Sequence, residues 1–494
     1  MREPYLRAVD PHLVLSGRRD LPGEIYRELR AAILDGRIAG GERLPATREL
    51  AVRLNVSRTT VALAYDRLIS EGYATGRVGS GTYVEANIAS RDGRPTQPRR
   101  ALRPRHAWDS VPLPAVFRVD HPEYDFRGGI PDARLFPHDQ WRRLIARQFR
   151  SAAVGHGLYG EPAGHLGLRE AIARHVGVSR GVRAVAEDIV VTNGTQQAVD
   201  IVARVLLEPR DRVAVEDPGY SPIRLLFEAI GARVTAVPVD DEGLVVDALP
   251  TETRLVYVSP SHQFPLGMSM SLPRRRALTA WAADHDAAVI EDDFDGEFRY
   301  GAKPIEALQT LDKSGRVIYV GSFSKTMLPT MRLGFVIVPE SLRIATQAAK
   351  FLTDWHTSLA LQAALATFID DGLFARHVRR MRTVYQGRHE KIIEVLGRTF
   401  EDELAIIPSS VGLHVSALAR TASVDQIATL VRVASGAGVE CFPLSLFSAG
   451  NNPRAGLLLG YGAIDTDQIE PGLNRLKSCF AAMDAPQSRR RRAS

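Results

Sequence analysis

One lysine stands out by its position in this sequence. Lysine occurs six times among the 494 residues, at Lys303, Lys313, Lys325, Lys350, Lys391 and Lys477. Lys325 alone follows an apolar predicted strand, residues 316–320, and it lies beside the hydroxyls of Ser322 and Ser324. A lysine forms a Schiff base with a carbonyl group when its surroundings favour the neutral amine. Arg332, a few residues further on, adds a cation that can hold a phosphate through two parallel hydrogen bonds.

Two other predicted strands end in polar clusters, and α/β sheets bind ligands at the carboxyl ends of their strands. Residues 189–192 precede Asn193-Gly-Thr-Gln-Gln197, whose small residues open a helix with free N–H groups that suit a phosphate. Any strand–turn–helix connection also needs a glycine, so this segment alone is ambiguous. Residues 212–215 precede Glu216-Asp-Pro-Gly-Tyr220. The tyrosine can stack on a flat ring, or it can simply pack against the helix that follows.

Three successive carboxylates, Glu291-Asp-Asp293, end the predicted strand 288–290. Buried carboxylates are costly unless a cation is near. A metal ion is one candidate, although the segment supplies no histidine, and we predict no metal site. A protonated pyridine nitrogen is another candidate, and it needs only one buried carboxylate. Phosphate cradle, stacking ring, carboxylate, lysine and arginine in this order favour a single cofactor site.

The elements that must position these residues form an α/β domain. From about residue 122 to 482 short apolar strands alternate with helical stretches, which is typical of a mainly parallel sheet, and we assign this effector domain to residues 116–482. Residues 86–115 carry six arginines and five prolines with little apolar material, which predicts a semi-extended linker. Residues 483–494 contain four consecutive arginines and are expected to form a disordered basic tail.

Residues 1–85 form a separate head with short helical patterns and a glycine-rich hairpin. Ile25, Leu29 and Ile33 make one apolar stripe on a first helix. After a second helix, Asn55 suits a left-handed turn, and Ser57 is a natural N-cap for a third helix. The periodicity leaves three residues exposed at the start of that third helix, where a recognition helix meets DNA: Arg58, Thr59 and Thr60. Arg77, on the hairpin that follows, is positioned to enter a minor groove.

The head resembles the winged helix of GntR-type repressors. The resemblance rests on Leu44-Pro-Ala-Thr-Arg-Glu-Leu-Ala51, Asn55-Val-Ser-Arg-Thr-Thr-Val61 and Leu68-Ile-Ser-Glu-Gly-Tyr73. The family's pattern implies DNA contacts at Arg48, Arg58, Thr59, Thr60 and Gly79. With Ser57 and Arg77, these residues make up the DNA-binding surface that we predict.

The effector domain resembles fold-type I pyridoxal-phosphate (PLP) enzymes of the aspartate aminotransferase type. This resemblance implies a mainly parallel sheet with helices on both faces and a small C-terminal α+β subdomain. The motifs are Tyr159-Gly-Glu-Pro-Ala-Gly164, Thr192-Asn-Gly-Thr-Gln-Gln197, Glu216-Asp-Pro-Gly-Tyr220, Pro260-Ser-His-Gln-Phe-Pro265, Ile290-Glu-Asp-Asp293, Ser322-Phe-Ser-Lys325 and Arg332. Together with the head, they identify the chain as a member of the MocR subfamily of GntR-type regulators, over about residues 20–480.

The resemblance implies a role for each motif residue. Lys325 forms the internal aldimine, Asp292 meets the pyridinium nitrogen and Tyr220 stacks on the ring. The residues implied to bind the phosphate are Gly194, Thr195, Gln196, Ser322 and Arg332, with Tyr159 contributed by the partner subunit of a homodimer. Arg454 matches the arginine that holds a substrate carboxylate in these folds. Where many family members have a tyrosine this chain has Phe294, so His262 is the candidate donor to the cofactor's phenolic oxygen.

The composition fits a protein of the cytoplasm. The chain is 45% hydrophobic and 24% charged, has two cysteines, and shows neither a signal peptide nor an apolar run long enough for a membrane. Its net charge of +6 allows a polyanionic partner without establishing one.

We therefore expect a cytoplasmic, PLP-holding regulator that is nucleoid-associated when bound to double-stranded operator DNA. It would sense an amino acid, an ω-amino acid or an aminosulfonate through aldimine chemistry at Lys325, with at most weak transaminase activity. Arg454 would read the anionic group of this small amine effector. Three alternatives stay open: a working aminotransferase with an incidental head, a PdxR-like regulator that senses PLP itself, and a repressor that has lost its cofactor.

Overall fold

The computed structural model describes residues 20–77, 79–86, 103–108, 111–112, 122–150, 158–301, 306–450 and 453–484. These belong to two compact units, Met1–Pro104 and Arg105–Ser494. Most of the linker predicted at 86–115 and residues 485–494 of the predicted tail lie outside the described residues. Residues 483 and 484, predicted to belong to the tail, instead end a helix. The described end of the linker belongs to the second unit, where the guanidinium of Arg105 donates to the carbonyl of Ala229 at 3.5 Å.

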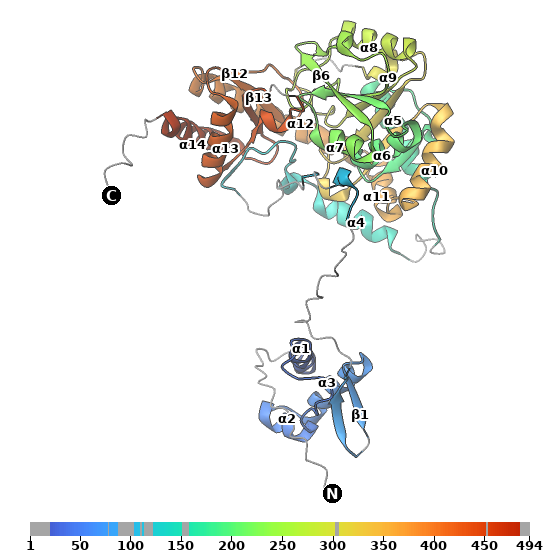
Figure 1. Ribbon diagram of the computed structural model, residues 1–494, viewed down its shortest axis with the longest axis vertical. Helices are drawn as coiled ribbons and strands as arrows, with labels where there is room; N and C mark the ends of the chain where they lie inside the picture. The colour runs from blue at the N-terminus through green and yellow to red at the C-terminus, as the bar shows by residue number, and fades with distance from the viewer. Residues whose placement is uncertain are drawn as a thin grey trace, which may run out of the picture. The chain divides into compact units, whose positions relative to one another are not determined.

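The first unit is a three-helix head with a two-stranded antiparallel hairpin (Figure 1). Its elements are α1 (Leu21–Leu34), α2 (Thr47–Leu54), α3 (Arg58–Ser70), β1 (Ala74–Arg77) and β2 (Gly81–Val84). The apolar stripe of α1 is buried against Val61, Tyr65 and Leu68 of α3, so the predicted periodicity produces the core of the head. No helix among the described residues of the chain is long and apolar enough to cross a membrane.

The turn and caps of the head follow from its sequence. Asn55 adopts the left-handed conformation, with φ of 52°, at the end of α2. The hydroxyl of Ser57 then accepts a hydrogen bond from the amide of Thr60 at 3.0 Å and caps α3. Gly79, at the tip of the hairpin, has φ of 75°, which a glycine adopts without strain. All three features agree with the sequence-based predictions.

The second unit contains an eight-stranded sheet. The strand order is β4-β11-β10-β9-β8-β5-β6-β7, and it is parallel except at β11 and β7. The strands are β4 (Ile189–Thr192), β5 (Arg212–Asp217), β6 (Arg233–Asp240), β7 (Gly243–Leu244), β8 (Thr253–Val258), β9 (Ala288–Asp293), β10 (Val317–Ser322) and β11 (Gly334–Ile337). The expectation of a mainly parallel sheet is confirmed.

Helices cover both faces of this sheet, because successive strand residues point to opposite sides. On β4, Val190 packs with α6 (Thr195–Leu206) and α7 (Ser221–Ile230). Ile189 and Val191 pack with α5 (Leu166–Arg180), α11 (Leu359–Asp370) and α12 (Leu373–Thr399) on the other side. The remaining helices around the sheet are α4 (His138–Gln148), α8 (Leu272–Asp284), α9 (Leu308–Leu311) and α10 (Arg343–Asp354).

A smaller α+β part follows α12. Its four-stranded sheet has the order β12-β13-β16-β15, and Figure 1 shows α13 and α14 lying beside β12 and β13. The elements are β12 (Leu404–Ile406), β13 (His414–Ala419), α13 (Val424–Gly436), β15 (Phe442–Pro443), β16 (Gly456–Gly460) and α14 (Thr466–Asp484). A short parallel pair, β3 (Tyr124–Asp125) with β14 (Val439–Glu440), joins the start of the unit to this part.

Candidate functional site

The three carboxylates at the end of β9 have different partners. Glu291 accepts hydrogen bonds from the amides of Leu308 and Gln309, the first two residues of α9, at 2.7 and 3.0 Å. The carboxylate of Asp293 lies 2.6 Å from Nε of Arg180 and accepts the hydroxyl of Tyr319 at 2.5 Å. Both side chains project from the face of the sheet that carries α5 and α9. Asp293 already has a cation beside it in Arg180, although its Oδ1 is also buried without a hydrogen-bond partner among the described residues.

Asp292 points to the opposite face and keeps an oxygen without a partner. Its Oδ2 accepts the hydroxyl of Tyr257 at 2.5 Å, whereas Oδ1 is buried and has no hydrogen-bond partner among the described residues. Burial raises the pKa of this carboxyl to about 7; the Tyr257 bond opposes the rise, and Asp293 and Asp295 add to it. A buried carboxylate in this state gains from a nearby cation. A protonated pyridine nitrogen is a cation that fits the unpaired Oδ1.

Lys325 lies just beyond the end of β10, the strand next to β9. Its Nζ donates to the carbonyl of Gly129 at 2.6 Å. The loss of water around the amine lowers its pKa, while the charges of Asp295 and Asp292 oppose that effect. A lowered pKa increases the fraction of neutral amine, which is the form that attacks an aldehyde.

The loop between β4 and α6 is shaped to hold an anion. Gly194, with φ of 82°, precedes the first residue of α6, and the Nη2 atom of Arg332 donates to the carbonyl of Asn193 at 2.9 Å. A Cβ added at Gly194 would lie 3.0 Å from this Nη2, and one added at Gly334 would lie 2.9 Å from Cα of Gly194. Only glycine allows this close approach of loop, arginine and β11.

Donors converge on this loop. Thr195 and Gln196 are the first residues of α6, where amide groups have no partner within the helix. Arg332 adds a guanidinium beside them. Ser322 ends β10, and its hydroxyl accepts the amide of Ser324 at 3.1 Å, which leaves its own hydrogen to donate. A helix N-terminus with an adjacent guanidinium and hydroxyl suits a phosphate group.

Tyr220 lies within electrostatic range of both Asp292 and Arg332. The pKa of its hydroxyl is raised, first by the loss of water and then by Asp292, while Arg332 acts in the opposite direction. The ring is 37% exposed and meets the ring of Phe264 edge to face, with centroids 5.7 Å apart. Phe264 therefore supports the Tyr220 ring, and the ring remains accessible for stacking on a flat ligand.

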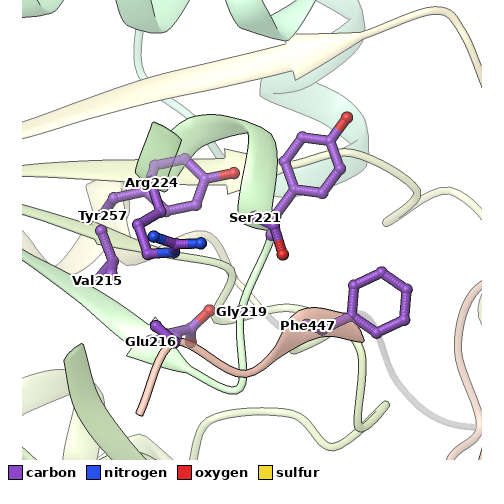
Figure 2. Close-up of a pocket in the computed structure, with 9 residues that line it drawn as sticks. Val215, Glu216, Gly219, Ser221, Arg224, Tyr257 and Phe447 are labelled. Atoms are coloured by element: carbon purple, nitrogen blue, oxygen red, sulfur yellow. The ribbon is translucent and has the colours of Figure 1, made fainter. Parts of the chain in front are cut away.

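A hollow beside Tyr220 has room for about one water molecule rather than for an amino acid. Figure 2 shows Val215, Glu216 and Tyr257 on one side of it and Phe447 on the other. Glu216 Oε2 accepts both the amide and the hydroxyl of Ser259, and its Oε1 is buried without a partner among the described residues. Burial raises the pKa of Glu216 to about 7. The residues around the hollow therefore support Tyr220 rather than form a binding pocket for an amino acid.

His262 forms part of a buried polar cluster. Its Nδ1 lies 2.9 Å from both carboxylate oxygens of Asp295, and its Nε2 is buried without a partner among the described residues. The ring stacks on Phe294 and lies 4.7 Å from the ring of His414. The side chains of His262, Asp295 and His414 are close enough together to hold a metal ion. However, Asp295 engages Nδ1 of His262 and the carbonyl of Pro265 engages Nε2 of His414, so we interpret them as a hydrogen-bonded cluster. The proposed role of His262 at the cofactor's phenolic oxygen stays a prediction.

Two predicted site residues lie apart from this cluster. Tyr159 is 75% exposed and stacks on Trp355, with ring centroids 4.5 Å apart. Arg454 precedes β16, and its Nη2 donates to the carbonyl of Val239 at 2.8 Å. No hydrogen bond or ring contact among the described residues joins either side chain to Lys325, and the roles of both remain predictions.

The predicted DNA-contacting residues of the head share an accessible surface. Arg58 and Thr59 are exposed at the capped start of α3, with Thr60 half-buried behind them. Arg48 of α2 and Arg77 of the hairpin are also exposed. The guanidinium of Arg77 lies 4.8 Å from the ring centre of Tyr83, which holds it against the hairpin.

Sequence reasoning missed the residues that orient the site. Each of them forms a hydrogen bond with a site residue: Tyr257 with Asp292, Asp295 with His262, the carbonyl of Gly129 with Lys325, and the carbonyl of Asn193 with Arg332. Tyr257 offered a signal, because it lies in an apolar segment of the sequence, one residue before the end of β8, which pairs with β9. Gly129 offered none, since the contact joins residues almost 200 positions apart.

Both units match known protein families. Residues 21–84 match the family of bacterial regulatory proteins of gntR type, and residues 131–449 match aminotransferase class I and II. The chain is 38% identical to the probable rhizopine catabolism regulatory protein MocR of Rhizobium meliloti, over 96% of this chain and 97% of that protein. It is 30% identical to the pyridoxine biosynthesis transcriptional regulator PdxR of Corynebacterium glutamicum, over 94% of this chain and 95% of that protein.

The larger unit also resembles solved aminotransferases. A kynurenine aminotransferase from Pyrococcus horikoshii, solved with PMP, superimposes with a TM-score of 0.67 and 28% identity. The match covers 73% of this chain and 91% of that enzyme. The fold is therefore the fold-type I aminotransferase fold, preceded by a winged helix.

Proposed function

The chain belongs to the MocR subfamily of GntR-type transcriptional regulators, in which a winged helix precedes a PLP-type aminotransferase domain, and we propose that it regulates transcription in response to an amine. The head would bind operator DNA, and the larger unit would sense the amine through PLP at Lys325. The observation that carries this proposal is Asp292: its buried, unpaired oxygen lies at the site that Lys325 and the anion loop share. A DNA-binding protein of this kind acts in the cytoplasm.

DNA binding is supported by the head. Its third helix begins with a capped turn that exposes Arg58 and Thr59, and such a helix start reaches base edges and phosphates in a major groove. The hairpin carries Arg77 and the unhindered Gly79, around whose Cβ position no atom lies within 4 Å. A phosphate backbone can approach that tip closely.

The residues of the larger unit fit PLP at its ring nitrogen, its ring face, its phosphate and its aldehyde carbon. Asp292 would keep the proton on the ring nitrogen, Tyr220 would hold the ring plane, and the loop at Gly194 with Arg332 would bind the phosphate. Lys325 would bond to the aldehyde carbon. When bound, PLP supplies a carbonyl carbon that bonds reversibly to primary amines. Ligand binding would then exchange the protein's amine for that of the effector.

The effector is proposed to be a small primary amine with an anionic group, read by Arg454. A guanidinium has five N–H donors and binds carboxylates or sulfonates through two parallel bonds. Among the described residues, the Arg454 side chain donates one hydrogen bond, to the carbonyl of Val239. Two alternative hypotheses remain. In one, Arg454 only pairs with a carboxylate of the protein; in the other, PLP itself is the signal and Arg454 has no role in sensing.

A homodimer is supported by α10 and its surroundings. This helix buries Thr346 and Lys350 but exposes apolar side chains: Ile344 is 85% and Leu352 80% exposed. Tyr159 and Trp355 lie close by and are also exposed. An apolar surface of this kind is typical of an interface, and a second copy would place Tyr159 at its partner's phosphate. Sedimentation velocity tests this, and a monomer at micromolar concentration would contradict it.

The second candidate function is catalysis, which the likeness to aminotransferases favours. Phe294 argues against it, because it cannot donate the hydrogen bond that a tyrosine gives to the cofactor.

One measurement tests the cofactor site, and a second separates the two candidates. Borohydride reduction of the PLP-loaded protein, followed by peptide mapping, should place the cofactor on Lys325, and a label at Lys303 or Lys313 would refute the site. Steady-state transamination should be far below the ~10 per second of ordinary enzymes. Turnover at that rate would refute a purely regulatory role.

A further inference from the structure

A second lysine of the larger unit is buried outside the cofactor cluster. Lys350, on α10, has no exposed surface. Its Nζ donates to Oε1 of Gln197 at 2.9 Å, to Oδ1 of Asp354 at 2.6 Å and to the hydroxyl of Thr357 at 3.1 Å. An ammonium group has three hydrogens, so each of them has a partner.

Asp354 connects Lys350 to the loop that follows β4. Its Oδ2 accepts the side-chain amides of Asn193 and Gln197, at 2.7 and 2.8 Å. Gln197 closes the network, since its Oε1 accepts the backbone amide of Asn193 at 2.8 Å. Asn193 is thereby held through both its side chain and its main chain.

The orientation of Asn193 decides what the anion loop presents. The peptide group between Asn193 and Gly194 is planar, with its carbonyl and its N–H pointing in opposite directions. The carbonyl accepts Nη2 of Arg332 at 2.9 Å. Fixing Asn193 therefore fixes both the position of this guanidinium and the direction of the Gly194 amide.

Helix stability does not explain the Lys350–Asp354 pair. Asp354 is the last residue of α10, where a negative charge meets the negative end of the helix dipole. Lysine placed four residues before an acid is also the weaker order for a pair on a helix. Burial lowers the pKa of Lys350, with Asp354 opposing the shift, so the charge is costly at this position. The contacts with the loop account for its presence.

We propose that the Lys350–Asp354 pair positions the phosphate loop, by holding Asn193 so that the Gly194 and Thr195 amides and Arg332 face one anion. The proposal gives neither residue of the pair a contact with the cofactor. The proposal rests on the proposed function to the extent that the anion is the phosphate of PLP.

The test compares PLP binding by wild type, Lys350→Met, Asp354→Asn and the double variant, all as full-length protein. Affinity is measured from the visible absorbance that appears as cofactor-free protein is titrated, and the phosphate is observed by phosphorus-31 NMR. Asp354→Asn should weaken binding about tenfold, as for loss of one charge-assisted hydrogen bond, and should shift the phosphorus signal. The double variant should lose no more than the stronger single variant, because the two residues act together.

Arg204→Met is the matched control. Arg204 lies on α6, the helix that follows the loop. Its side chain is 57% exposed and pairs with Asp200, so its replacement removes an ion pair from α6 without changing a contact of the loop. This variant should bind PLP like wild type with an unchanged phosphorus signal. If Asp354→Asn does not fold, Asn193→Ala removes the same link from a side chain that is partly exposed, and the same two effects are expected.

The outcomes separate this inference from the proposed function. Wild type that shows no lysine-bound PLP would refute the proposed function. Wild type that binds PLP, with variants of equal affinity, would refute positioning by the pair. Weaker binding with an unchanged phosphorus signal would also refute it, because the phosphate would then be held as before.

Discussion

Replacing Asp292 by asparagine should make the cofactor-free protein more stable at neutral pH. The pKa of this buried carboxyl is raised from 3.8 to about 7. The folded state therefore binds the proton more tightly than the unfolded chain does. The stability from this group is complete at low pH and is lost as the pH rises through about 7. Asparagine keeps an oxygen that accepts the Tyr257 hydroxyl, but it never ionises.

The size of the effect follows from the two pKa values. Each tenfold change in proton affinity is worth about 1.4 kcal/mol, so the full difference corresponds to about 4 kcal/mol. Roughly 2–3 kcal/mol of it falls between pH 5 and pH 8. Glu216 and Glu291, whose pKa values are also raised to about 7, titrate in the same range. Both remain in the variant, so the difference between the two proteins reports Asp292 together with its electrostatic effect on Glu216.

Urea unfolding followed by tryptophan fluorescence measures this difference. All four tryptophans (Trp108, Trp141, Trp281 and Trp355) belong to the larger unit, so the head does not contribute to the signal. Asp241→Asn, at an exposed position, serves as the control and should follow wild type at every pH. Equal dependence of unfolding free energy on pH for wild type and Asp292→Asn would refute the reasoning. So would a PLP affinity that the substitution leaves unchanged, since the cation would then have lost no partner.

Three further predictions concern recognition and the electronic state of the cofactor. Arg58→Ala should weaken operator binding by about 1–3 kcal/mol if the side chain reads a base; equal affinity across a series of salt concentrations would contradict this. Arg454→Ala should abolish the spectral response of the PLP-loaded protein to anionic amines, and an unchanged response in a titration with γ-aminobutyrate, taurine and α-amino acids would exclude Arg454 as the reader. Phe294→Tyr should lower the pH at which the absorbance of the lysine-bound cofactor changes, because a new donor to the phenolic oxygen weakens its hold on the imine proton. A spectrophotometric pH titration that gives the same midpoint for both proteins would exclude that contact.

Local patterns in the sequence determined the elements and the ends of strands. The cap at Ser57, the left-handed Asn55 and the glycine of the hairpin are decided by a few neighbouring residues, and all three agree with the structure. The strand before Lys325 and the turn at Gly194 are local as well. Their types could be read from the sequence because backbone conformation and hydrogen bonding within a turn depend on adjacent side chains.

Only the tertiary structure decided which carboxylate at the end of β9 faces the proposed cofactor site. The alternation along a strand puts Asp292 on one face and its two neighbours on the other, but the sequence does not say which face holds partners. Those partners are Arg180 from α5, Tyr319 from β10 and the amides that open α9. The link from Lys350 to Asn193 is of the same kind. The side chains that the fold brings within hydrogen-bonding distance decide the state of a buried charge, and the contacts that link the Lys350–Asp354 pair to Asn193 and Gln197 join segments more than 100 residues apart.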